Sequence, residues 1–219
     1  MARLLRISRT TVVRKLFYLA DQAELNLQKD NREKPLASTV EFDDMETFEH
    51  TKCKPLSITL AVESPSRRIL GFAVSQMPAK GLLSKIAFKK YGPRKDERYQ
   101  GRSQLFKELQ AVVSPTAHFK SDENPHYPQT VKAYFPLARH ETFKGQRGSI
   151  VGQGELKKVR FDPIFSLNHT CAMFRANVNR LFRRTWCTTK KPERLRMHLA
   201  IYANYHNKRL ISRRKVGQF

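Results

Sequence analysis

The chain has 219 residues, 40% of them apolar and 10% aromatic, which is a globular composition and excludes an intrinsically disordered protein. That length predicts one main domain with a short appendage. The 42 Lys and Arg against 19 Asp and Glu give a formal net charge of +23, which indicates a polyanionic partner, most often nucleic acid.

The first 27 residues predict a helix-turn-helix segment. Two apolar sets, at residues 4–7 and 12–19, are separated by Ser8, which can cap the second helix. That helix would present a polar and basic face suited to the major groove of DNA, formed by Arg9, Thr10, Arg14 and Lys15. Any short, basic, amphipathic helix pair gives the same pattern. Residues 28–37 are mostly polar and predict a linker.

Residues 38–219 predict an α/β domain with a mixed sheet flanked by helices. Three strand-like runs come first and suggest an antiparallel start: TVEFDDMETF, PLSITLAVES and RRILGFAVSQ. The segment KGLLSKIAFKKYG is ambiguous. After it, the spacing of the apolar residues predicts a helix, a short strand, a helix and a strand: GRSQLFKELQAVV, HFKSDE, NPHYPQTVKAYF and ARHETF. Two further helices are expected, one from Asn168 and one opened by Pro192.

Several motifs favour no particular site. GQRGSIVGQGELKK is glycine-rich but lacks the GxxxxGK[ST] pattern, so it predicts a loop and no nucleotide site. His50 with Cys53, and His169 with Cys171, lack structural zinc spacings. Trp186 could stack on an unpaired base, although a lone Trp is more often packed in a core. Further phosphate contacts are expected from a basic run: Arg183, Arg184, Lys190 and Lys191.

Cysteine usage and hydropathy indicate the compartment. The three cysteines form no CxxC pair, which indicates a reduced, cytoplasmic chain. No apolar stretch approaches the length of a bilayer span, and the N-terminus lacks a signal-peptide hydrophobic region. No membrane partner is therefore expected.

An acidic island interrupts this basic chain. Residues 41–49, EFDDMETFE, hold five acids and no base, whereas Glu193 is the single acid from Asn168 to Phe219. If the strand that contains Asp43 lies beside the strand that ends at Asp122, the two carboxylates could share one Mg²⁺. Two such ions about 4 Å apart would support phosphodiester chemistry. Solvated surface acids are the alternative interpretation.

Four segments, in this order from about residue 38 to about residue 210, resemble the DDE-type transposases of small bacterial insertion sequences: VEFDDMETF, SDENPHY, FDPIFSLNHTCAMFRANVNRLFRRTW and YANYHN. ISRTTVVRKL resembles the helix-turn-helix that precedes the catalytic domain in such enzymes. The resemblance implies an RNase H-like catalytic domain over residues 38–219, with Mg²⁺ or Mn²⁺ as cofactor. It also implies a double-stranded DNA substrate, a homodimer or larger assembly on DNA, and a nucleoid-associated location.

By position in these motifs, the resemblance assigns the first two catalytic and metal-binding aspartates to Asp43 and Asp122, with Asp44 as a less favoured register. The third acidic position falls on Asn168, and a basic residue seven positions on falls on Arg175. Asn in place of Glu is a departure from the family pattern, since an amide carbonyl can bind a hard cation but carries no charge. Two acids remain rivals for the third position: Glu155 and Asp162.

A second departure is that no cysteine-rich zinc ribbon precedes the helix-turn-helix. The expected activity is metal-dependent cleavage at insertion-sequence ends and strand transfer into target DNA. Two alternatives stay open: a catalytically inactive DNA-binding remnant of a transposase, and a basic RNA-binding protein.

Overall fold

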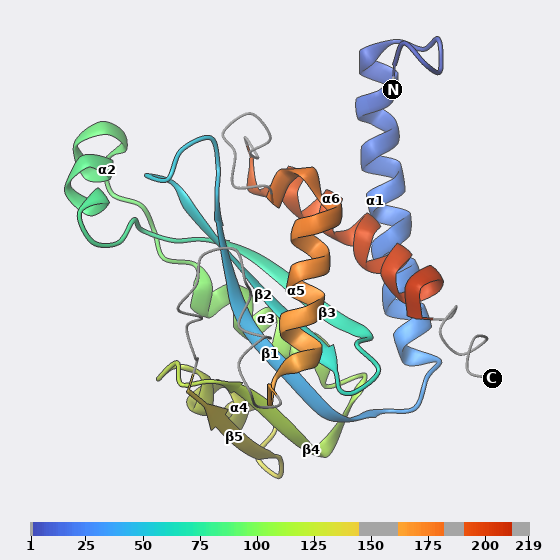
Figure 1. Cartoon of the computed structure of the whole chain (residues 1–219), viewed down its shortest axis with the longest axis vertical. Coiled ribbons are helices and arrows are strands. Elements are labelled where there is room, and N and C mark those ends of the chain that lie inside the picture. Colours follow the sequence, from blue (N-terminus) through green and yellow to red (C-terminus); the bar gives the residue numbers. More distant parts are fainter. Residues whose placement is uncertain (1, 145–161, 182–190, 212–219) are drawn as a thin grey trace.

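A five-stranded mixed sheet forms the centre of the fold, with helices on both faces (Figure 1). The computed structural model describes residues 2–144, 162–181 and 191–211. The strands are β1 (Ala37–Phe48), β2 (Pro55–Glu63), β3 (Ile69–Gln76), β4 (Val113–Asp122) and β5 (Arg139–Phe143). Their order is β3-β2-β1-β4-β5, with β1, β2 and β3 antiparallel and β4 and β5 parallel to β1.

The helices divide between the two faces of the sheet. They are α1 (Arg9–Arg32), α2 (Leu83–Tyr91), α3 (Arg98–Leu109), α4 (Tyr127–Tyr134), α5 (Phe165–Asn177) and α6 (Pro192–Tyr205). A 3₁₀ turn, η2 (Asn179–Leu181), follows α5, and a π-helical turn, η4 (His206–Ile211), follows α6. One apolar core joins α1, α5 and α6 to the sheet, and a second joins α3 and α4 to its other face.

Helices on both faces explain the burial of the central strands. Strand β2 is buried along residues 56–62, as expected for a strand covered on both sides, and even its polar residues Ser57 and Thr59 are fully buried. Strand β1 also contributes to both cores, with Phe42 directed to the α3 and α4 core and Met45 to the α5 and α6 core. The predicted α/β class, the antiparallel start and the RNase H-like mixed sheet are confirmed.

The N-terminal segment differs from the prediction of two helices and a linker. Residues 2–6 form turns, and one continuous helix, α1, runs from Arg9 to Arg32, through the first part of the expected linker. The buried amide of Asn31 explains the error, because its Nδ2 donates hydrogen bonds to the carbonyl oxygens of Ile69 (3.0 Å) and Leu70 (3.1 Å) in β3. A polar residue therefore anchors the helix where composition indicated a solvated linker.

The predicted cap at Ser8 is confirmed, since its Oγ accepts a hydrogen bond from the backbone N–H of Thr11 at 3.0 Å. Substitution Ser8→Ala is expected to weaken the first turn of α1 by about 1 kcal/mol. The first turn is exposed, so amide hydrogen exchange should accelerate at residues 10–13 alone. Unchanged exchange there would show that the cap contributes nothing.

One further boundary differs from expectation, since α5 begins at Phe165 rather than at Asn168. The segment after β3 that the sequence left ambiguous contains a helix, α2. The predicted glycine-rich loop lies outside the described residues. Within the described part of the chain, no helix has both the length and the apolar character needed to cross a bilayer.

Candidate active site

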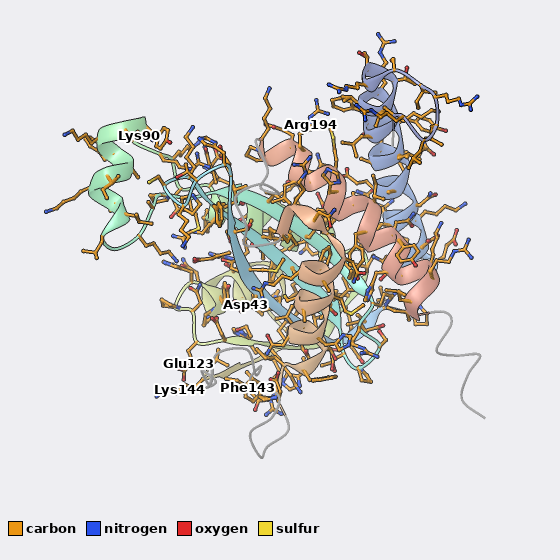
Figure 2. All side chains as sticks on the ribbon, turned by 45° about the horizontal axis from the view of Figure 1, so that its top comes forward. Asp43, Lys90, Glu123, Phe143, Lys144 and Arg194 are labelled. Carbon is orange, nitrogen blue, oxygen red and sulfur yellow. The ribbon has the colours of Figure 1, made fainter. Side chains whose placement is uncertain are left out.

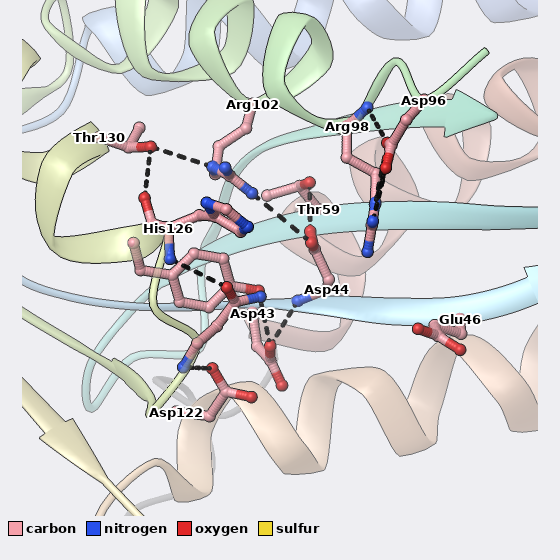
Figure 3. A network of polar contacts seen from close by, with 12 residues as sticks. Asp43, Asp44, Glu46, Thr59, Asp96, Arg98, Arg102, Asp122, His126 and Thr130 are labelled. Carbon is pink, nitrogen blue, oxygen red and sulfur yellow. Dashed lines mark hydrogen bonds and ion pairs between the residues drawn. The ribbon is translucent and has the colours of Figure 1, made fainter. Parts of the chain in front are cut away.

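Asp43 and Asp122 lie side by side on adjacent parallel strands. Glu41 of β1 is the Cα partner of Lys120 in β4, and each aspartate lies two residues further along its own strand. Because side chains alternate along a strand, the two carboxylates return to the same face of the sheet. Figure 3 shows them next to each other, over α5. The predicted neighbourhood of these two strands is thereby confirmed.

Both carboxylates are partly buried, and their pKa values are raised. Burial, and after it the charge of Asp122, raises the pKa of Asp43 to about 7. Burial also raises the pKa of Asp122, with smaller contributions from the charges of Asp44 and Glu123. Two neighbouring carboxylates that are partly buried resist simultaneous ionisation. A divalent cation between them would remove that repulsion.

The hydrogen bonds leave one oxygen of each carboxylate available. Oδ1 of Asp43 accepts hydrogen bonds from the backbone N–H of Asp44 (2.6 Å) and the hydroxyl of Tyr127 (2.9 Å). Oδ1 of Asp122 accepts one from the backbone N–H of Asn124 (3.0 Å). Among the described residues, no donor reaches Oδ2 of either aspartate. Two such oxygens fit the hard-ligand preference of Mg²⁺ or Mn²⁺.

The carboxylates form a pair rather than a larger acidic cluster. Within residues 2–144, 162–181 and 191–211, no three His, Cys, Asp or Glu side chains are grouped so that they could hold a metal ion.

The Asp44 side chain faces the opposite side of β1, where a hydroxyl and a guanidinium group already bind its carboxylate. Its Oδ1 accepts a hydrogen bond from the Thr59 hydroxyl, and its Oδ2 lies 3.8 Å from Nη1 of the buried Arg102. Arg102 in turn donates from Nε to Oγ1 of Thr130 (3.1 Å), as Figure 3 shows. This ion pair gives Asp44 a structural role and favours the Asp43 register.

The first turn of α5 is fixed against β1. The backbone N–H of Leu167 donates to Oε2 of the buried Glu41 at 2.8 Å. Asn168 follows directly, and its Nδ2 donates to Oδ2 of Asp162 at 2.8 Å. The other Asp162 oxygen accepts from the backbone N–H of Ile164 at 3.0 Å. Both oxygens of Asp162 are thus engaged at the start of α5.

One side of α5 approaches Asp43. Asn168, Cys171 and Arg175 are three and four residues apart, so they lie on one face of the helix. Burial raises the pKa of the Cys171 thiol to about 12; Arg175 opposes this shift, and the charge of Asp43 adds to it. Asn168 as a ligand stays a prediction, and its rival Glu155 lies outside the described residues.

The predicted DNA-binding residues fall on separate parts of the molecule. Those of α1 are all exposed, on the end of the helix that projects from the body in Figure 1: Arg9, Thr10, Arg14 and Lys15. Arg175 is exposed on α5, and Lys191 is exposed just before α6. The remaining three lie outside the described residues: Arg183, Arg184 and Lys190.

Three residues that the sequence did not single out support the site. Tyr127 holds Asp43, and burial together with the Asp43 charge raises the pKa of its hydroxyl, so that it stays a proton donor. Arg102 compensates Asp44, and Glu41 holds α5. Tyr127 lies in the SDENPHY segment and Glu41 in the acidic island, but neither pattern indicated a partner for these side chains.

Comparison with known proteins finds only distant likenesses. No protein-family model and no curated protein sequence matches the chain. Among solved structures, the catalytic domain of Mos1 mariner transposase is similar at 13% identity, over 87% of this chain and 94% of that chain, with a TM-score of 0.31. A Mos1 catalytic domain with Raltegravir and Mn gives 12% identity over the same shares and a TM-score of 0.25. The fold assignment rests on the sheet order and helix placement described above.

Proposed function

We propose that the chain is a DNA transposase, which cleaves phosphodiester bonds at insertion-sequence ends and transfers the freed strand to target DNA. The observation that supports this most is the juxtaposition of Asp43 and Asp122 on neighbouring parallel strands. The ordered resemblance of the chain to DDE-type transposases agrees with it. The net charge of +23 suits a double-stranded DNA substrate.

In this proposal, Oδ2 of Asp43 and of Asp122 would hold Mg²⁺ or Mn²⁺, and the Asn168 carbonyl would complete the site. The cation, when bound, supplies a polarised attacking oxygen and charge stabilisation for the leaving oxygen. Tyr127 orients Asp43 through the hydrogen bond to Oδ1. Glu41 fixes the first turn of α5 and with it the position of Asn168.

The basic surfaces would handle DNA on either side of this site. The projecting end of α1 would contact the element end, and Arg175 with the basic residues near α6 would hold the strands through phosphates. Cutting two ends of one element requires at least a dimer on DNA. A cytoplasmic, nucleoid-associated location belongs to the same proposal.

The test uses labelled duplexes that carry the DNA flanking this reading frame, with Mg²⁺ or Mn²⁺. Substitution Asp122→Asn is expected to lower cleavage about 10³-fold, because removing a metal ligand costs several kcal/mol of transition-state stabilisation. Duplex binding should be retained. The matched control is Glu123→Gln, which neutralises the adjacent exposed acid and should stay within about twofold of wild type.

Equal cleavage by Asp122→Asn and wild type would contradict the proposed site. A wild-type protein that binds these duplexes but cuts under neither metal would instead be an inactive DNA-binding remnant. Tighter binding to structured RNA than to any duplex would favour the RNA-binding alternative.

A further inference from the structure

A groove of about 310 Å³ opens beside the candidate site, between the end of β1 and the end of α5. We call it the β1–α5 groove; its walls include Met45, Glu46, Phe48, Lys52, Arg175 and Leu181. Met45 lies two residues beyond Asp43, which is roughly 7 Å along an extended strand. Arg175 lies seven residues beyond Asn168, two helical turns along α5.

Strand β1 and helix α5 run in the same general direction in Figure 1, and both lead from the candidate site toward the groove. A polymer whose reacting bond lies at Asp43 and Asp122 would therefore continue into the groove. A compact molecule held at the carboxylates alone would not reach it.

The groove combines an apolar floor with a cationic rim. The apolar floor is formed by the partly exposed ring of Phe48 and by the small exposed parts of Met45 and Leu181, which are 4% and 5% exposed. Lys52 and Arg175 are exposed and form the rim. The carboxylate of Glu46 already forms an ion pair with Lys80, because its Oε1 lies 2.5 Å from Nζ of that residue. No acid of the described residues forms an ion pair with Lys52 or Arg175. The rim therefore presents two cations to a ligand.

An apolar floor under two cations matches the chemistry of a nucleotide, which has a flat base and anionic phosphates on either side. The volume lies at the lower end of the range for small-molecule pockets, roughly 300–1,000 Å³. A base that remains stacked within a duplex cannot place its face on a floor of this kind.

We propose that the β1–α5 groove binds an unstacked nucleotide of a single DNA strand, adjacent to the phosphodiester that Asp43 and Asp122 would act on. Phe48, with the exposed parts of Met45 and Leu181, contacts the base, and Lys52 and Arg175 contact the flanking phosphates. The inference rests on the proposed function for its position along the strand. It adds that the bound end is locally unpaired.

The experiment measures binding of a fluorescent 12-nucleotide single strand, and of the blunt duplex of the same sequence, in EDTA at one fixed salt concentration. Substitutions Lys52→Gln and Arg175→Gln are each expected to weaken single-strand binding about tenfold, and Lys52→Gln should weaken duplex binding less than twofold. A third probe replaces three consecutive nucleotides by abasic sites, which keep the phosphates. It should bind wild type at least about fivefold more weakly than the intact strand, since base stacking contributes about 1–3 kcal/mol per base.

The matched controls remove exposed charges elsewhere: Lys107→Gln on α3 and Arg32→Gln at the end of α1. Single-strand affinities for Lys52→Gln and Arg175→Gln equal to those of the controls would overturn the groove assignment. Equal affinity for intact and abasic strands would overturn the role of the apolar floor. Tighter binding of the same sequence as RNA would overturn the assignment to DNA.

The EDTA assay separates this inference from the proposed function. If the variants lose single-strand binding while wild type never cuts DNA, the groove assignment holds and the proposed chemistry fails. If wild type cuts and Asp122→Asn does not, while the groove variants bind normally, the chemistry holds and the groove assignment fails.

Discussion

Substitution Asp43→Asn is expected to abolish cleavage and at the same time to stabilise the fold at pH 8 by about 2 kcal/mol. Burial and the neighbouring Asp122 raise the Asp43 pKa from 3.8 to about 7. The stabilising contribution of this group is therefore fully present below pH 3.8 and is lost as pH rises through 7. Three pKa units correspond to at most about 4 kcal/mol, and an amide keeps the oxygen that accepts from Tyr127.

The measurement is urea denaturation of wild type and Asp43→Asn between pH 5 and pH 8 without metal. The difference in free energy of unfolding should grow with pH across this window. Burial lowers the pKa of His140, His198 and His206, the last to about 4, so wild type and variant alike lose stability on acidification. Taking the difference at each pH cancels that common effect.

Added Mg²⁺ or Mn²⁺ provides the control for metal binding. A ligand that binds only the folded state stabilises by RT ln(1 + [L]/Kd), so wild type should gain stability at pH 8 and Asp43→Asn should not. A variant less stable than wild type at pH 8, or one that gains equally from metal, would refute the electrostatic description of the pair.

Substitution Phe42→Ala is expected to have the largest effect on stability, a loss of about 3–5 kcal/mol. Phe42 lies between Glu41 and Asp43 in β1 and is fully buried. Its ring centroid lies 5.0 Å from that of Phe106, 6.1 Å from that of Phe119 and 4.9 Å from that of Tyr127. Truncation leaves a cavity on the side of the sheet that holds the Tyr127 hydroxyl against Asp43. Metal affinity should therefore fall together with stability.

The free energy of unfolding from urea titrations checks this prediction, with Phe88→Ala as the matched control. Phe88 lies on α2 and is 65% exposed, so its truncation should change stability by less than about 0.5 kcal/mol. A loss below about 1.5 kcal/mol for Phe42→Ala would mean that the aromatic cluster collapses into the space and carries little of the stability.

The strands and the carboxylate pair could be predicted from sequence because their signals are local. Alternation and apolar runs marked β1, β2 and β3, and the motif positions marked Asp43 and Asp122. The error at the N-terminus arose because Asn31 forms its hydrogen bonds with residues 38 and 39 positions away in the chain. The composition of a short stretch of sequence gives no information about a hydrogen-bond partner that lies so far away in the chain.

The first residue of α5 was predicted wrongly for a similar reason. Glu41 accepts the hydrogen bond of the Leu167 N–H across 126 positions, and Asp162 uses both oxygens to begin the helix before Asn168. The pattern around SLNHT therefore indicated a helix but not its first turn. Whether Asn168 ligates a cation stays a prediction, which the comparison of Asn168→Ala with Asn168→Asp under Mn²⁺ would decide.

The continuity of α1 has a geometric consequence. Its C-terminal part is anchored to β3 through Asn31 and buried through Ala20, Ala23 and Leu27, while its first turns project from the body (Figure 2). A helix rises about 1.5 Å per residue, so Arg9 stands roughly 16 Å beyond Ala20 on a rigid arm. Because no hinge separates that arm from the sheet, the distance from its tip to Asp43 is set by the number of residues in one helix. The tip of α1 therefore lies at a fixed distance from the carboxylate pair. A DNA contact at this tip would determine which position along the duplex lies at Asp43 and Asp122.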